Sequence, residues 1–92
     1  MTTQAVTVVN ALGMHARAAA RFVHTAASFE SQIRVARDNR VMDGKSIMGI
    51  LLLAAACGTV ITITAEGVDE QAAVDSLRRL VETGFGEGSC TV

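Results

Sequence analysis

The chain has 92 residues, half of them hydrophobic, and a formal net charge of −1. This length supplies enough surface for one modest core, so we expect a single domain over residues 1–92. The nearly neutral charge excludes a strongly basic nucleic-acid-binding protein. The longest apolar run, residues 47–57, is shorter than the ~20 residues that span a bilayer, which argues against membrane insertion.

The first half of the chain predicts a strand, a helix and a hairpin. Residues 4–9 are rich in β-branched side chains and indicate a strand. From Ala16 onward the apolar side chains recur at helical spacing, while Arg17 and Arg21 lie on the opposite stripe. This pattern predicts an amphipathic helix with a cationic outer face. Residues 31–43 contain two strand-like runs around a turn and indicate a hairpin.

The second half predicts a helix, a strand and a further helix. Ser46 precedes the apolar run 47–57 as a preferred N-cap residue, and Gly58 follows it as a C-cap, so we expect a short helix between them. Residues 59–65 alternate in hydrophobicity and indicate the last strand. Asp69 is suited to cap the final helix.

The order of these elements, β-α-β-β-α-β-α, predicts an α+β fold. We expect an open-faced β-sandwich, in which a four-stranded antiparallel sheet is covered on one face by three helices. The glycine-rich end, "GFGEGSCTV", is predicted to fray, with a flexible tail at residues 88–92.

The charge distribution and the cysteines indicate which ligands, metals and cellular compartment to expect. Residues 1–46 carry a balance of +3 and residues 47–92 one of −4, so the first half favours an anionic ligand or an acidic partner. Cys57 and Cys90 lack the close-spaced Cys or His residues that a zinc site needs, and we expect no metal and no cofactor. The start of the chain lacks the pattern of a signal peptide, so we expect a cytoplasmic protein with reduced thiols.

The stretch "ALGMHARAAARF" places His15 immediately before the first helix. Gly13 permits a tight turn, and the backbone amides of Ala16 and Arg17 point out of the first helical turn, where anions bind. The Arg17 guanidinium adds charge-assisted hydrogen bonds to phosphate oxygens, and a neutral imidazole is a nucleophile toward phosphorus. The alternative is that His15 is satisfied by a backbone group and has no chemical role.

Three stretches carry a resemblance to a known family: "NALGMHARAAARF", "DGKSIMGILLLAAACGTVITITAEG" and "DEQAAVDSLRRLVETGFGE". From Thr3 to about Glu87 the chain resembles HPr, the histidine-containing phosphocarrier family of the bacterial phosphoenolpyruvate-dependent phosphotransferase system. The resemblance implies that Enzyme I passes a phosphoryl group to Nδ1 of His15, that Arg17 contacts this group, and that His15 hands it to an enzyme IIA domain. It also implies that the protein is a phosphocarrier and not an enzyme, because it does not catalyse turnover by itself.

The same resemblance implies roles for residues at the second helix. Ser46 matches the serine that an HPr kinase/phosphorylase phosphorylates in many bacteria, which implies regulation. Ile47, Met48 and Leu51 are implied to dock with Enzyme I and IIA domains, and the helix has more apolar side chains than its core face needs. Arg21 is a further candidate for docking an acidic partner.

Ala18 departs from the family pattern, which most often has proline at this position. The resemblance extends to members with alanine there, which often serve regulatory rather than sugar-transporting phosphorelays. Three alternatives therefore stand beside a sugar-transport carrier: a carrier of a nitrogen-related regulatory phosphorelay, a ligand-binding regulatory module that carries no phosphate, and a regulator that acts only through Ser46. In each case we expect a monomer.

Overall fold

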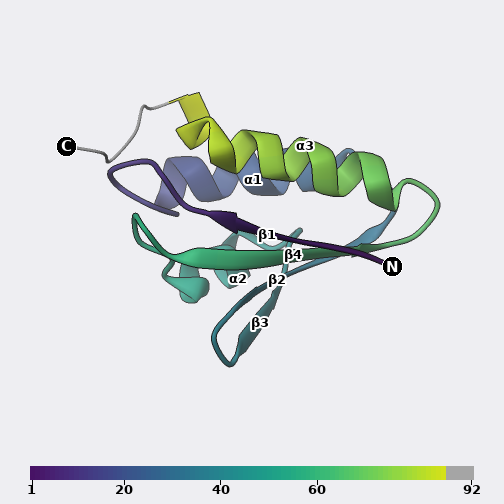
Figure 1. The fold of residues 1–92 in the computed structure, drawn as a ribbon, viewed down its shortest axis with the longest axis horizontal. Helices are drawn as coiled ribbons and strands as arrows, with labels where there is room; N and C mark the ends of the chain where they lie inside the picture. Colours follow the sequence, from purple (N-terminus) through teal and green to yellow (C-terminus); the bar gives the residue numbers. More distant parts are fainter. Residues whose placement is uncertain (87–92) are drawn as a thin grey trace.

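The computed structural model describes residues 1–86 and contains a four-stranded sheet with three α-helices and a short 3-10 turn (Figure 1). The elements are β1 (Thr2–Thr7), α1 (Ala16–Ala27), β2 (Gln32–Arg37), β3 (Arg40–Asp43), α2 (Ile47–Leu53), β4 (Val60–Glu66), α3 (Glu70–Glu82) and η1 (Gly84–Gly86). The predicted flexible tail at residues 88–92 lies outside the described residues.

The sheet has the strand order β1-β4-β2-β3, and each neighbouring pair is antiparallel. Side chains along β4 alternate between two faces: Ile61 and Ile63 are fully buried, whereas Thr62 between them lies on the more exposed face. In Figure 1, α3 lies across β1 and β4 with α1 behind it, and α2 lies beside β2 and β3. This arrangement confirms the predicted open-faced β-sandwich.

The hydrophobic core lies between the buried face of the sheet and the helices. Full burial of one such aliphatic or aromatic side chain contributes about 1.5–3 kcal/mol. Alanines of α1 allow this helix to approach its neighbours closely. The largest fully buried side chains are Phe22, Phe85, Ile33, Ile50, Leu53, Ile61, Ile63, Leu77, Val8, Val35, Val74 and Val81.

Helix α2 is shorter than its apolar run predicts. It ends before Ala54, whose backbone is left-handed with φ of 54°. Arg37 and Arg40 of the hairpin donate hydrogen bonds of 3.0 and 2.8 Å to the last two carbonyls of the helix. The predicted C-cap at Gly58 is therefore wrong: these tertiary donors satisfy carbonyls that a local cap would otherwise bond.

Asp69 occupies the N-cap position of α3, but its side chain makes no cap hydrogen bond. The carboxylate instead accepts hydrogen bonds of 2.9 Å from the backbone N–H groups of Glu30 and Ser31, and another from the Ser31 hydroxyl. The hydroxyl, followed by the backbone N–H groups, lowers the pKa of Asp69. The predicted N-cap position of Asp69 is therefore confirmed, but its side chain does not cap the helix. It ties the connection between α1 and β2 to the start of α3.

The predicted fraying is wrong for residues 84–86, which form η1. Phe85 is 1% exposed, and its ring belongs to the core. The three residues have φ of 66°, 56° and 76°, so the chain makes a left-handed turn after α3. Glycine tolerates this conformation, whereas Phe85 adopts it with its ring buried.

Cys57 is half-buried in the turn that follows α2. It is disulfide-bonded. The reduced thiol expected from the absence of a signal peptide is therefore wrong for this residue. Cys90, the other cysteine in the sequence, lies outside residues 1–86.

Glu70 ties the first residues of the chain to α3. Its carboxylate accepts hydrogen bonds of 2.6 Å from the Thr2 hydroxyl and 3.3 Å from the backbone N–H of Gly67. It also lies 2.9 Å from the amino group of Met1. The Thr2 hydroxyl first, and then the amino terminus and the Gly67 N–H, lower the pKa of Glu70 from 4.5 to about 2.

This lowered pKa predicts a pH dependence of stability. A carboxyl group whose pKa falls on folding stabilises the fold above its unfolded-state pKa, and this stabilisation is lost as the pH falls through the folded-state pKa. We expect the free energy of unfolding of the wild type to fall between pH 4.5 and 2. The Glu70→Gln variant should have a lower free energy of unfolding than the wild type at neutral pH. Its free energy of unfolding should also fall less between pH 4.5 and 2. Urea unfolding across this pH range measures both, with Glu30→Gln as an exposed control; parallel curves for wild type and E70Q would contradict the prediction.

Candidate functional site

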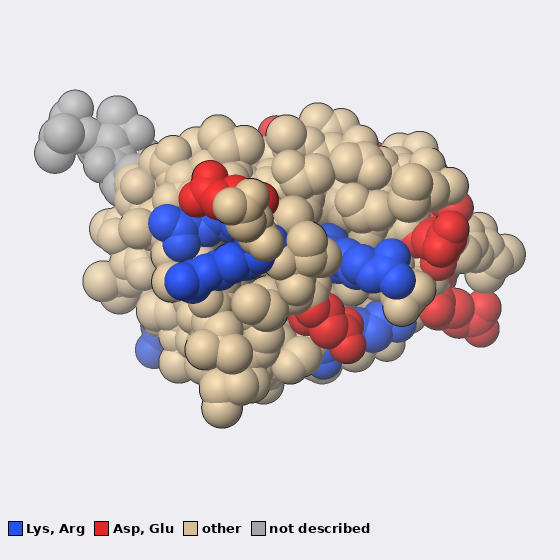
Figure 2. Space-filling model, turned by 90° about the horizontal axis from the view of Figure 1, so that it is seen from below, with Lys and Arg blue, Asp and Glu red and all other residues tan. Residues whose placement is uncertain are grey.

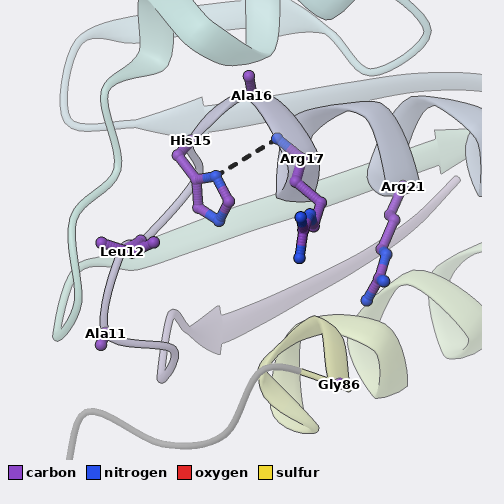
Figure 3. Close-up of a pocket in the computed structure, with 7 residues that line it drawn as sticks. All are labelled: Ala11, Leu12, His15, Ala16, Arg17, Arg21 and Gly86. Carbon is purple, nitrogen blue, oxygen red and sulfur yellow. Dashed lines mark hydrogen bonds between the residues drawn. The ribbon is translucent and has the colours of Figure 1, made fainter.

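His15 is the N-cap residue of α1. Its backbone is extended, with φ of −76° and ψ of −178°, and its carbonyl accepts the first helical hydrogen bond, 2.8 Å from Ala19 N. The imidazole Nδ1 accepts a hydrogen bond of 3.3 Å from the backbone N–H of Arg17 (Figure 3). Nδ1 is thus the hydrogen-bond acceptor in this geometry, and its lone pair is directed at the Arg17 N–H in the first turn of the helix.

A buried turn positions His15. The Asn10 side chain donates a hydrogen bond of 2.7 Å to the carbonyl of Gly13, whose own N–H donates 3.0 Å back to the Asn10 carbonyl. Met14 is buried, and its N–H donates 2.9 Å to the carbonyl of Ala55 in the segment after α2. Two anchors therefore fix the chain just before the imidazole.

Gly13 is confirmed as a residue that this turn requires. Its φ is 63°, and a Cβ at this position would lie 2.5 Å from the Ala55 carbonyl oxygen. Asn10 has no assigned role in the sequence prediction, although an asparagine three residues before a glycine is a recognisable turn signal.

An open hollow of about 680 Å³ lies beside the imidazole. In Figure 3 the side chains of His15, Arg17 and Arg21 extend to the same side of α1. The first turn of α1 contains no acidic residue, so the two guanidinium groups and the positive end of the helix dipole favour an anion here. The hollow is lined by Ala11, Leu12, His15, Ala16, Arg17, Arg21 and Gly86.

The two arginines of the hollow differ in their contacts. The side chain of Arg17, two residues after His15, is exposed to solvent. The Arg21 guanidinium donates a hydrogen bond from Nη1 to the carbonyl of Phe85 in η1. Arg21, predicted as a docking residue, thus also joins α1 to the end of the described chain.

The family comparisons agree with this geometry. A family model described as "PTS HPr component phosphorylation site" matches residues 2–83. The chain belongs to the HPr family. The Phosphocarrier protein HPr of Cupriavidus necator is 46% identical over 82 residues, which cover 89% of this chain and 92% of that protein. The Phosphocarrier protein HPr of Neisseria meningitidis serogroup A is 44% identical over 88 residues, covering 96% and 99%.

A crystal structure of HPr-C-His from Thermoanaerobacter tengcongensis has the same fold. It aligns with a TM-score of 0.92 and 45% sequence identity, over 96% of this chain and 99% of that one. The chain is therefore a phosphocarrier protein of the HPr family, and the resemblance found in its sequence is confirmed.

Ser46 is confirmed as the N-cap residue of α2 in this HPr-family chain. Its backbone is extended, and its Oγ accepts a hydrogen bond of 3.1 Å from the N–H of Gly49. Its own N–H donates 3.2 Å to the carbonyl of Asp43. The Oγ thus uses a lone pair to cap the helix, and its hydroxyl proton takes no part in this hydrogen bond.

Replacing Ser46 with alanine is expected to lower the free energy of unfolding by about 1 kcal/mol, because the Gly49 N–H loses its acceptor. Urea denaturation of the wild type and S46A measures this difference. Ser46→Asn, which retains a side-chain acceptor, should keep most of the stability. Equal stabilities of S46A and the wild type would show that the cap contributes nothing.

The exposed apolar side chains of α2 differ partly from the predicted docking set. Ile47 and Met48 are 47% and 65% exposed, as a docking role requires. Leu51 is half-buried and packs against the core, whereas Leu52 is 56% exposed. Leu12, which lines the hollow together with His15, is 72% exposed and is not among the predicted site residues.

Charged side chains of both signs lie on the surface. Figure 2 shows Lys and Arg at several places on the face seen from below, and Asp or Glu lies next to most of them. Within residues 1–86, no helix has the length and hydropathy needed to cross a bilayer. In the same range, no three His, Cys, Asp or Glu side chains come together as metal ligands. His24 is exposed in the last turn of α1, away from the residues of the hollow.

Proposed function

We propose that this HPr-family phosphocarrier accepts a phosphoryl group on Nδ1 of His15 from phospho-Enzyme I and passes it to enzyme IIA domains in the cytoplasm. The observation that carries the proposal is the direction of the Nδ1 lone pair, which faces the Arg17 N–H at the start of α1. A nucleophilic nitrogen thus lies where a helix amino terminus binds anions.

The transfer step follows from this geometry. The Nδ1 lone pair attacks phosphorus, an N–P bond forms, and the bond between phosphorus and the donor's leaving group breaks. Nδ1 then no longer accepts from Arg17, and the amides of Ala16 and Arg17 donate to phosphoryl oxygens instead. The Arg17 guanidinium adds charge-assisted hydrogen bonds. Transfer onward from His15 to a IIA domain is favourable because a protonated imidazole is a good leaving group.

Partner docking is proposed for the apolar surface of α2. Ile47 and Met48 present exposed apolar side chains, Leu51 supports them from a half-buried position, and the cations Arg17 and Arg21 suit an acidic rim on a partner. An apolar patch next to charges is typical of a protein-binding surface. Exposed methionine adapts its shape to several partners in turn, as Enzyme I and IIA domains would require.

Ser46 is proposed as the substrate of an HPr kinase/phosphorylase. A phosphate at the N-cap of α2 is compatible with the helix, because negative charge is tolerated at a helix amino terminus. The same charge next to Ile47 and Met48 would oppose docking to an anionic partner surface. Phosphorylation of Ser46 would therefore reduce phosphoryl transfer to His15.

The test is a reconstituted transfer. The protein is incubated with labelled phosphoenolpyruvate, Mg²⁺ and Enzyme I, and we expect an acid-labile, alkali-stable label that a IIA domain then removes. Omission of Enzyme I should abolish labelling, since the carrier does not turn over alone. IIA domains of a sugar permease and of a nitrogen-related relay serve as alternative acceptors. An unlabelled protein in the complete mixture would overturn the proposal.

A further inference from the structure

The η1 turn is a strained segment next to the His15 hollow. Gly84, Phe85 and Gly86 all have left-handed backbones, a conformation that disfavours residues with a Cβ. Phe85 nevertheless adopts it, with its ring in the core and 1% exposed. Such strain persists only where surrounding contacts hold it.

Arg21 supplies one of these contacts from α1. Its Nη1 donates to the Phe85 carbonyl, and its side chain and Gly86 line the same hollow as His15 (Figure 3). A Cβ on Gly86 would lie 3.3 Å from Nη1 of Arg21. The guanidinium and the turn are therefore packed against each other, and together they form the side of the hollow opposite Leu12 and Ala11.

We propose that Arg21 is a positioning residue: it latches the turn Gly84–Gly86 against α1, and the latched turn shields one side of a phosphoryl group on His15 from water. The inference rests on the proposed function of His15. The reaction that the latch slows is hydrolysis, in which a water oxygen bonds to phosphorus, the N–P bond breaks, and the released imidazole takes up a proton. Opening of the turn would expose this side of the phosphoryl group to water as well and shorten the lifetime of phospho-His15.

The latch predicts a specific pattern among variants. Arg21→Ala removes the donor. Gly86→Ala keeps Arg21 but crowds its Nη1 and strains the turn. Both should shorten the half-life of phospho-His15 about fivefold, which corresponds to about 1 kcal/mol of activation free energy. The double variant should be no worse than R21A, because both changes break the same contact.

Gly58→Ala is the matched control. Its φ is 90°, so alanine is strained there too, yet a Cβ would have no atom within 4 Å. It should keep the wild-type half-life. Amide hydrogen exchange at Phe85 supplies a second measurement, which should quicken in R21A and G86A and stay unchanged in G58A.

The phosphoryl group is supplied by phosphoramidate, a small-molecule donor, so that the test does not depend on Enzyme I. A half-life of G86A equal to that of G58A would overturn the latch while leaving the proposed function intact. Equal half-lives are expected if Arg21 protects phospho-His15 only through its charge, because G86A retains the guanidinium. Absence of phosphohistidine at His15 in the wild type would instead overturn both the proposed function and the latch.

Discussion

Replacing His15 with alanine is expected to abolish phosphorylation by phosphoenolpyruvate and Enzyme I while leaving the fold intact. Alanine has no nucleophile, and no other side chain lining the hollow is a histidine. The lost N-cap acceptor for the Arg17 N–H should cost about 1 kcal/mol of stability. Label incorporation measures the first effect, and urea unfolding measures the second.

Two variants separate chemistry from stability in this experiment. His15→Asn restores a favoured N-cap side chain without a nucleophilic imidazole, so it should recover stability and remain unlabelled. His24→Ala removes an exposed histidine from the last turn of the same helix and should be labelled as the wild type is. Labelled H15A, or unlabelled H24A, would place the phosphoryl group on another residue.

Replacing Gly13 with alanine is expected to be the most damaging single-methyl change at the site. The new Cβ would lie 2.5 Å from the Ala55 carbonyl oxygen and 2.9 Å from the Ala56 Cα, and both are backbone atoms that cannot rotate away. Overpacking together with the left-handed φ should cost about 3 kcal/mol of stability. The turn must also shift, which displaces the imidazole of His15.

Displacement of a reacting group by about 1 Å can cost roughly 100-fold in rate, so we expect G13A to accept the phosphoryl group about 100 times more slowly. Single-turnover labelling under conditions where the variant remains folded measures this rate. Gly58→Ala, which adds a methyl at a left-handed position with no neighbouring atom, should lose only about 1 kcal/mol and label normally. Equal rates for G13A and G58A would show that the close packing of Gly13 does not position His15.

Much of the site is predictable because its residues are close in the sequence. His15 before a helical pattern places an imidazole beside the amides of Ala16 and Arg17, since an N-cap side chain reaches the next two or three amides. Ser46 caps α2 for the same reason. Alternating and helical periodicities likewise predicted the element order, because each depends on neighbouring residues alone.

The predictions that are wrong concern groups bonded across the fold. Asp69 binds Glu30 and Ser31 instead of capping its own helix. Helix α2 ends where Arg37 and Arg40 reach its carbonyls, before the expected Gly58. In both cases donors from distant segments compete with local partners, and the sequence pattern does not contain their positions.

The sequence by itself determined the strands and helices, the turn at Gly13 and the position of His15 at a helix amino terminus, because these follow from local backbone preferences and hydrophobic periodicity. Only the tertiary structure decided which groups surround the imidazole. Ala55 anchors the turn before it, and Phe85 folds back to accept a hydrogen bond from Arg21. The residues of each pair lie far apart in the chain, and packing of the core brings them together.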